Sequence, residues 1–143
     1  MIRSVMAVVA LFVTNPSSAE SDYIFCVSDS SEPSGFTFSK GLVFRSFISE
    51  EGVTARIETP RREIDAYTEF RKKLHWQSKG WGLSGWYHLD RETLGLDLKR
   101  EGVTVEHWDC QLLPDADSLT EKLKGVEKKR QLEIDEETKG NRI

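Results

Sequence analysis

Three histidines, His75, His88 and His107, are the side chains of this chain best suited to hold a metal ion. Zinc and copper sites bring several nitrogen, sulfur or carboxylate ligands close together. The length of the turn at residues 101–102 decides whether His88 and His107 lie on opposite faces of a sheet or in one row, and a row would still need a third ligand such as Asp97. We therefore predict no metal and no cofactor, and we interpret the histidines as solvated side chains.

The tryptophans are the most unusual feature, because Trp76, Trp81 and Trp86 follow one another at intervals of five residues. Trp76 and Trp86 are expected to pack in the core or at its rim. Trp81 stands between Gly80 and Gly82, which permit a tight turn. This predicts a loop tip whose indole could stack on a sugar ring or fill a pocket of a partner. The alternative is a tryptophan folded back as a lid over the end of the domain.

We predict that Trp81, Trp76 and Lys79 form the surface that binds a small ligand or a protein partner. Lys79 lies close in sequence to the basic run at residues 71–73. This basic group could meet an acidic partner or lipid head groups, and a solvated face of a helix is the alternative.

Motifs for catalysis are absent from the sequence. It contains no Gly-x-Ser-x-Gly, no P-loop, no dinucleotide fingerprint and no His-Glu-x-x-His. The carboxylates are mostly flanked by Lys or Arg, as solvated charges are, although a carboxylate pair can also form in space between distant residues. We therefore predict no catalytic residues and favour a non-enzymatic protein, with a small periplasmic hydrolase as the alternative.

The first nineteen residues have the order of parts that an export signal needs. Arg3 gives a positive start, Val5 to Val13 is apolar, residues 14–16 break a helix, and the small residues 17–19 suit cleavage after Ala19. A membrane anchor is the alternative, but so short an apolar helix reaches only about 14 Å of a ~30 Å hydrocarbon core. The prediction is a periplasmic or secreted protein without a stable membrane anchor.

Exactly one pair of cysteines, Cys26 and Cys110, is present. In an oxidising compartment, such a pair most simply forms one disulfide. A metal pair or a free thiol is the alternative, but Cys26 has no other Cys or His within several residues. The net charge of −4 gives no electrostatic reason to bind nucleic acid.

The elements that must position these residues are mainly strands. Alternating apolar and β-branched residues, bounded by turn residues, predict strands at 23–27, 36–38, 42–48, 53–57, 86–90, 93–98 and 103–113. In the hairpin with a turn at residues 91–92, Leu89 is expected to face Leu94 and Tyr87 to face Leu96.

Two segments complicate this pattern. The apolar spacing of Ile64, Tyr67, Phe70 and Leu74 predicts a short inserted helix over residues 61–74, against the alternative of a strand ending at residues 74–76. In the last strand, alternation slips between the odd-numbered Val103 and Val105 and the even-numbered Trp108, Cys110 and Leu112. A β-bulge near residues 106–107 would place all five on the core face.

The C-terminal segment is expected to be a charged helical tail. Residues 118–121 resemble a capping box, and Leu119, Leu123 and Val126 form a narrow apolar stripe. We predict a signal peptide at 1–19, an antiparallel β-barrel or sandwich at 20–114, and at 115–143 a charged helix that frays into a mobile tail.

The segment from Trp86 to Leu96, followed by a strand ending in Cys110, resembles small exported bacterial proteins with a Leu-Asp-Arg hairpin and a late cysteine. That resemblance implies no activity. The expected architecture is also similar to that of periplasmic inhibitors of c-type lysozyme, which are small, β-rich and held by an early and a late cysteine. Residues 84–87 and 76–80 correspond in part to the inhibitory motifs of that family, in the reverse order.

Together these observations favour an exported protein that binds a ligand or a protein partner, with inhibition as one form of that function. A structural component of an envelope assembly, docking through the C-terminal helix, is a third possibility.

Overall fold

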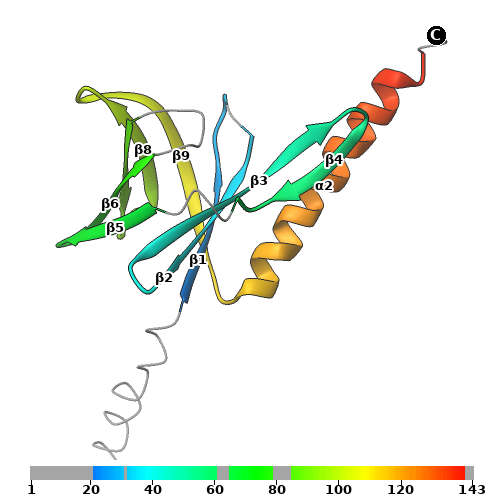
Figure 1. Cartoon of the computed structure of the whole chain (residues 1–143). Coiled ribbons are helices and arrows are strands. Elements are labelled where there is room, and N and C mark those ends of the chain that lie inside the picture. The colour runs from blue at the N-terminus through cyan, green and yellow to red at the C-terminus, as the bar shows by residue number, and fades with distance from the viewer. Residues whose placement is uncertain (1–20, 31, 61–64, 79–84, 141–143) are drawn as a thin grey trace, which may run out of the picture.

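The computed structural model describes residues 21–30, 32–60, 65–78 and 85–140 (Figure 1). The predicted signal peptide lies outside these ranges. The described elements are β1 (Ser21–Val27), β2 (Ser34–Ser39), β3 (Leu42–Glu51), β4 (Thr54–Glu58), β5 (Asp65–Phe70), β6 (Lys73–Ser78), β7 (Gly85–Asp90), β8 (Gly95–Arg100), β9 (Val103–Leu113) and α2 (Ala116–Thr138).

The strands form a closed antiparallel barrel, as expected. Within the described residues, eight strands follow one another around the ring in the order β1, β2, β3, β5, β6, β7, β8, β9, and β9 returns to pair with β1. β4 lies outside the ring, because the second half of β3 leaves β5 and pairs with β4 instead. Closure gives every strand of the ring two neighbours, so the ring itself has no edge strand.

The inner face of the barrel is filled by large side chains. Trp76 stacks on Tyr87 with 5.2 Å between ring centroids, and Phe36 and Phe38 lie against the same indole. Trp108 contacts the opposite side of this cluster through Tyr87. A ring of eight strands is just wide enough for such filling, so the middle of the barrel is a solid core.

The disulfide between Cys26 and Cys110 is present and joins directly opposed residues of β1 and β9. It therefore lies where the first and last strands of the ring meet. The prediction of one intramolecular bridge is confirmed.

The helix predicted over residues 61–74 is wrong for the part of that range that the structure describes. Residues 65–70 and 73–78 are the two strands of a hairpin, with Arg71 in the left-handed conformation at its turn (φ 57°). Tyr67 lies opposite Trp76, and Leu74 lies opposite Glu69. Tyr67 and Leu74, on either side of the turn, thus share the inner face, and their spacing of seven residues also fits the period of a helix. The alternative strand through residues 74–76 is the one that forms.

Two details of the β7–β8–β9 hairpins also differ from expectation. The turn after β7 is longer than two residues, so Leu89 pairs with Leu96 and Tyr87 with Leu98. This shift of two residues keeps the predicted face. The expected bulge in β9 is present one position earlier, since Leu98 pairs with Glu106 while Lys99 pairs with Thr104.

The bulge does not bring all five predicted residues into the core. Trp108 is buried and Cys110 packs against the core, whereas Val103, Val105 and Leu112 are exposed. Val103 and Val105 lie before or within the bulge near the end of the hairpin. Leu112 lies beyond the filled part of the barrel, opposite Ile24.

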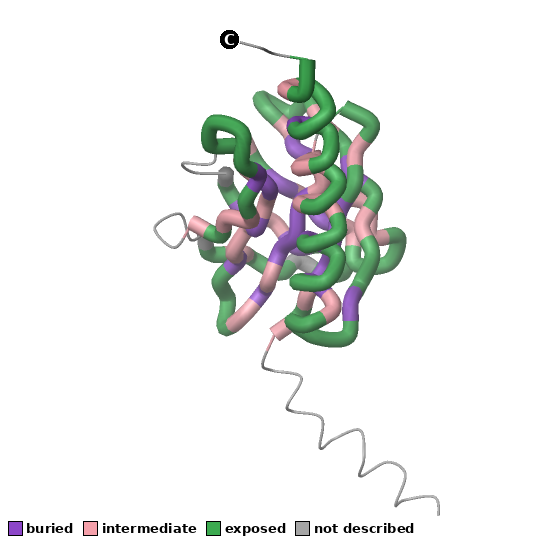
Figure 2. Tube along the Cα trace, turned by 90° about the vertical axis from the view of Figure 1, so that its right-hand side faces the viewer, coloured by how far each residue is buried: buried purple, intermediate pink, exposed green. Residues whose placement is uncertain are grey.

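α2 packs against the outer face of the barrel (Figure 2). Leu119 and Leu123 are buried against Phe25 and Leu113, and Ile134 is buried against the β3–β4 hairpin. The N-cap residue of α2 is Asp115 and not Ser118, which the sequence predicts. The Asp115 carboxylate accepts a hydrogen bond from the Ser118 amide at 2.8 Å. The helix continues to Thr138, so most of the predicted C-terminal segment is helical.

Candidate ligand site at the barrel mouth

A pocket of about 340 Å³ opens at the end of the barrel formed by the β2–β3, β5–β6 and β7–β8 turns. This volume falls at the lower end of the range of small-molecule sites. Its wall is made of apolar side chains, Ile24, Phe38, Tyr67, Leu74, Leu89, Leu94 and Leu112, and charged side chains, Asp22, Lys40, Glu69 and Arg91, line it as well.

The floor of the pocket is the solid core of the barrel. Ile24, Phe38 and Leu89 are buried there. Phe38 is held edge-on against both Tyr67 and Trp76. A ligand would therefore enter only the mouth and rest its apolar part on a preformed surface.

The charged rim is built by two turns that hold each other. The backbone amide of Arg91 donates to the carbonyl of Lys72 at 2.8 Å, which ties the β7–β8 turn to the β5–β6 turn. The Arg91 guanidinium then pairs with the Glu69 carboxylate, with 2.5 Å between Nη1 and Oε2. Both side chains are about half exposed, and exposed pairs contribute little to stability, so this pair can rearrange around a charged group of a ligand.

Leu94 reaches the mouth from a backbone conformation that leucine rarely adopts, with φ at 62°. Its amide donates to the Asp90 carbonyl, and its carbonyl accepts from the Cys110 amide. The Asp90 carboxylate accepts from the amides of Glu92 and Thr93, and these bonds lower the pKa of Asp90. The turn is thus fixed by hydrogen bonds that keep a strained leucine at the pocket wall.

Leu112 completes the wall from β9, although it is 59 % exposed. It faces inward at a level where the core no longer fills the barrel. An exposed apolar side chain at the edge of a concave apolar surface is a typical element of a binding site.

The three histidines lie on the outer face of the barrel in one row across four strands. His75 pairs with His88, His88 with Asp97, and Asp97 with His107. Within the described residues, no group of three or more His, Cys, Asp or Glu is arranged to hold a metal ion.

Two members of this row, His88 and His107, differ in the direction of their pKa shifts. The Nδ1 atom of His107 is hydrogen-bonded to the Asp97 carboxylate at 2.6 Å. Its Nε2 atom is hydrogen-bonded to the Asp109 carboxylate at 3.2 Å. The Asp97 hydrogen bond, followed by that of Asp109, raises the pKa of His107. Burial, and then the neighbouring charges of His75, Lys99 and Lys73, lowers the pKa of His88.

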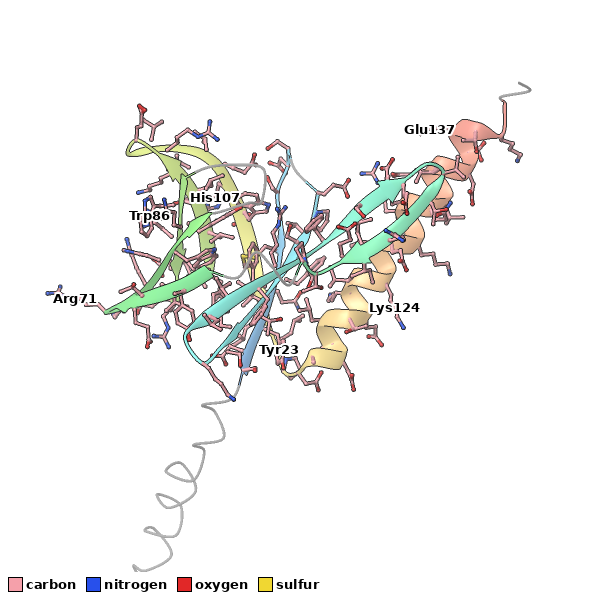
Figure 3. All side chains as sticks on the ribbon, in the orientation of Figure 1. Tyr23, Arg71, Trp86, His107, Lys124 and Glu137 are labelled. Atoms are coloured by element: carbon pink, nitrogen blue, oxygen red, sulfur yellow. A yellow bond between two sulfur atoms is a disulfide. The ribbon has the colours of Figure 1, made fainter. Side chains whose placement is uncertain are left out.

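The described residues include only one of the three predicted binding residues, Trp76. Trp81 and Lys79 lie outside the described residues. Trp76 is fully buried in the core, where it has no surface to offer a partner unless the barrel opens. Trp86 was expected in the core or at its rim, but it lies on the outer face and is 49 % exposed (Figure 3).

Sequence reasoning missed the mouth because its apolar wall comes from six strands and a turn that are far apart in the sequence. The one local signal is Leu94, an apolar residue directly after the turn segment at residues 90–93. The apolar stripe of the C-terminal helix is not a free surface, because Leu119 and Leu123 are buried against the barrel.

No family model matches the chain, and neither a curated protein nor a solved structure matches it. Among the described helical residues, none forms a helix both long and apolar enough to cross a bilayer.

Proposed function

We propose that this protein is an exported, non-enzymatic binding protein that takes a small amphipathic ligand into the mouth of its barrel. The observation that carries the proposal is the pocket itself, an apolar wall with charged side chains at its rim. Such a surface suits a ligand with an apolar body and a charged or polar head, because the body is removed from water while the head stays at the rim.

Two features of the wall support a binding role over a purely structural one. Leu94 occupies a left-handed conformation that Gly or Asn would adopt with less strain. Leu112 leaves most of its side chain in water. Strained and exposed apolar residues that share one concavity are found at ligand sites more often than elsewhere.

The disulfide supports the proposed location outside the cytoplasm. Bridges of this kind persist in oxidising compartments and are rare in reducing ones. The export-like segment before Glu20 agrees with the same location.

The test uses anilinonaphthalene sulfonate, an apolar probe with one charged group, and follows its fluorescence on titration with the protein. The variant Leu112→Ser should weaken probe binding by up to about tenfold, since part of an apolar wall is lost. Leu132→Ser is the matched control, because Leu132 lies on α2 with the same exposed fraction, 59 %. Equal binding by the two variants, or no saturable binding by the parent protein, would contradict the proposal.

Inhibition of a c-type lysozyme is the second candidate. The observations that favour it are the small barrel closed by an early and a late cysteine and the exposed indole of Trp86, a residue type enriched at the centres of protein interfaces. A lysozyme activity assay with the parent protein and Trp86→Ala tests it. Absence of inhibition at saturating protein would exclude this candidate and leave the ligand site untouched.

A further inference from the structure

The outer-face row of histidines contains one pair whose side chains already touch. His75 of β6 and His88 of β7 are direct antiparallel partners, and their imidazole centroids lie 4.4 Å apart. Directly opposed residues on one face have Cβ atoms about 4.5–5.5 Å apart. The backbone therefore holds the two rings side by side.

One ring nitrogen of His75 lacks a hydrogen-bond partner. Its Nε2 atom is buried and makes no hydrogen bond in the structure. Buried polar nitrogens without a partner are rare in folded proteins. The indole nitrogens of Trp76 and Trp108 share this state but can only donate, whereas an imidazole nitrogen can also bind a metal ion. His107 differs, because both of its ring nitrogens are engaged by Asp97 and Asp109.

The spacing of the pair suits one shared ion. A zinc–imidazole bond is about 2.0–2.1 Å long, so two nitrogens bound to one tetrahedral ion lie about 3.4 Å apart. Rings whose centroids are 4.4 Å apart can reach that separation by rotation about their side-chain bonds alone. Imidazole nitrogen favours zinc, copper and nickel over calcium or magnesium.

We propose that His75 and His88 form a surface chelate for one divalent transition-metal ion, with water completing its coordination. The two imidazoles supply both protein ligands. The proposal is independent of the ligand site, since the pair faces outward and the pocket lining faces inward. It also departs from our sequence-based prediction of no metal, because the sequence alone does not show which residues of β6 and β7 are paired.

The test is a titration of Zn²⁺ into protein prepared without a histidine tag, followed by calorimetry and by NMR of the imidazole nitrogens. We expect saturation at one equivalent, with the resonances of His75 and His88 shifted and that of His107 unchanged. His75→Gln and His88→Gln should each weaken binding by at least about tenfold, the loss that follows even from removing an outer-shell partner of a metal site. His107→Gln is the matched control and should bind as the parent does.

A second readout separates metal binding from misfolding. Zn²⁺ should raise the melting temperature of the parent and of His107→Gln, because a ligand that binds only the folded state stabilises it. It should have no such effect on the other two variants, whose metal-free melting temperatures report their folding. The proposal is overturned if Zn²⁺ does not bind saturably, if both pair variants bind as the parent does, or if His107→Gln loses binding equally.

Discussion

Trp86 and Trp108 show how one sheet separates two similar residues into different roles. Trp108 points into the barrel and is 2 % exposed, whereas Trp86 points outward and is 49 % exposed. Replacing a buried tryptophan by alanine removes its burial and leaves a cavity, at about 3–5 kcal/mol, whereas a surface replacement changes stability by under ~1 kcal/mol.

We therefore expect Trp108→Ala to lower the free energy of unfolding sharply and Trp86→Ala to leave it nearly unchanged. Urea unfolding followed by circular dichroism measures both. A large loss for Trp86→Ala would show that this indole is covered in solution. Trp81, which the sequence predicts at a loop tip, lies outside the described residues, and we predict that Trp81→Ala also leaves the free energy of unfolding nearly unchanged.

His88 and His107 should titrate at different pH values although both lie on the same face. The pKa of His107 is raised by Asp97, so its favourable interaction is fully present below about pH 6.5, the unfolded value, and is lost as the pH rises through the raised pKa. The pKa of His88 is lowered, so protonation of this residue opposes folding as the pH falls below the same unfolded value.

Asp97→Asn isolates the contribution of the Asp97 carboxylate to the pKa values of His107 and His88. The substitution removes the carboxylate that raises the pKa of both residues, so we expect the pKa of His107 to fall and that of His88 to fall further. NMR titration of the imidazole resonances measures both values. An unchanged pKa of His107 would mean that the Asp97 hydrogen bond does not persist in solution.

At the scale of elements, α2 protects the strand that lies outside the ring. β4 pairs with β3 alone among the described strands, and an unpaired strand edge invites association with other chains. Gln131 covers part of this edge: its Oε1 atom accepts from the Ala55 amide and its Nε2 atom donates to the Val53 carbonyl, each at 2.8 Å. Arg130 adds ion pairs to Glu32 and Glu50.

Gln131→Ala should loosen this contact and lower the free energy of unfolding by about 1–3 kcal/mol, the net value of two lost hydrogen bonds, of which the one to the Ala55 amide is partly buried. Hydrogen exchange should show faster exchange at the Ala55 amide, with the amides of β8 unaffected. Leu132→Ala, at the neighbouring exposed position, is the control. Unaltered exchange at Ala55 would contradict the bridging role of Gln131.

At the scale of the whole molecule, the disulfide fixes the closure of the barrel. It joins cysteines separated by 84 residues in the sequence, at the junction of the first and last strands. Loss of so long a closed loop corresponds to about 4.5 kcal/mol in the chain-entropy model.

Reduction should therefore lower the urea midpoint substantially. The double variant Cys26→Ala, Cys110→Ala should unfold near the reduced parent, with or without reductant. A reductant that leaves the midpoint of the parent unchanged, despite complete thiol alkylation, would show that strand pairing alone closes the barrel.

Export is the second prediction at this scale. Protein recovered from the compartment outside the cytoplasm should begin at Glu20, because cleavage is expected after Ala19. Intact mass and N-terminal sequencing measure this directly. Soluble exported protein that retains residues 1–19 would contradict it.

The features that depend on neighbouring residues or on simple counts could be predicted from the amino-acid sequence. Strand periodicity identified β1, β3, β4 and the hairpins of β7, β8 and β9, and a lone cysteine pair identified the disulfide. These predictions succeed because alternation and turn residues act within a few positions of each other.

The assignment of side chains to the core, the pocket mouth and the outer surface required the pairing of strands that are distant in the sequence. The spacing of Tyr67 and Leu74 satisfies a helix and a hairpin equally, and only pairing with Trp76 and Leu89 selects the hairpin. The sequence neighbours of Trp86 predict a core residue, and those of Leu94 predict an ordinary hairpin residue. Their places at the outer face and at the mouth depend on registers between strands, and register is an interaction between distant segments that no local pattern records.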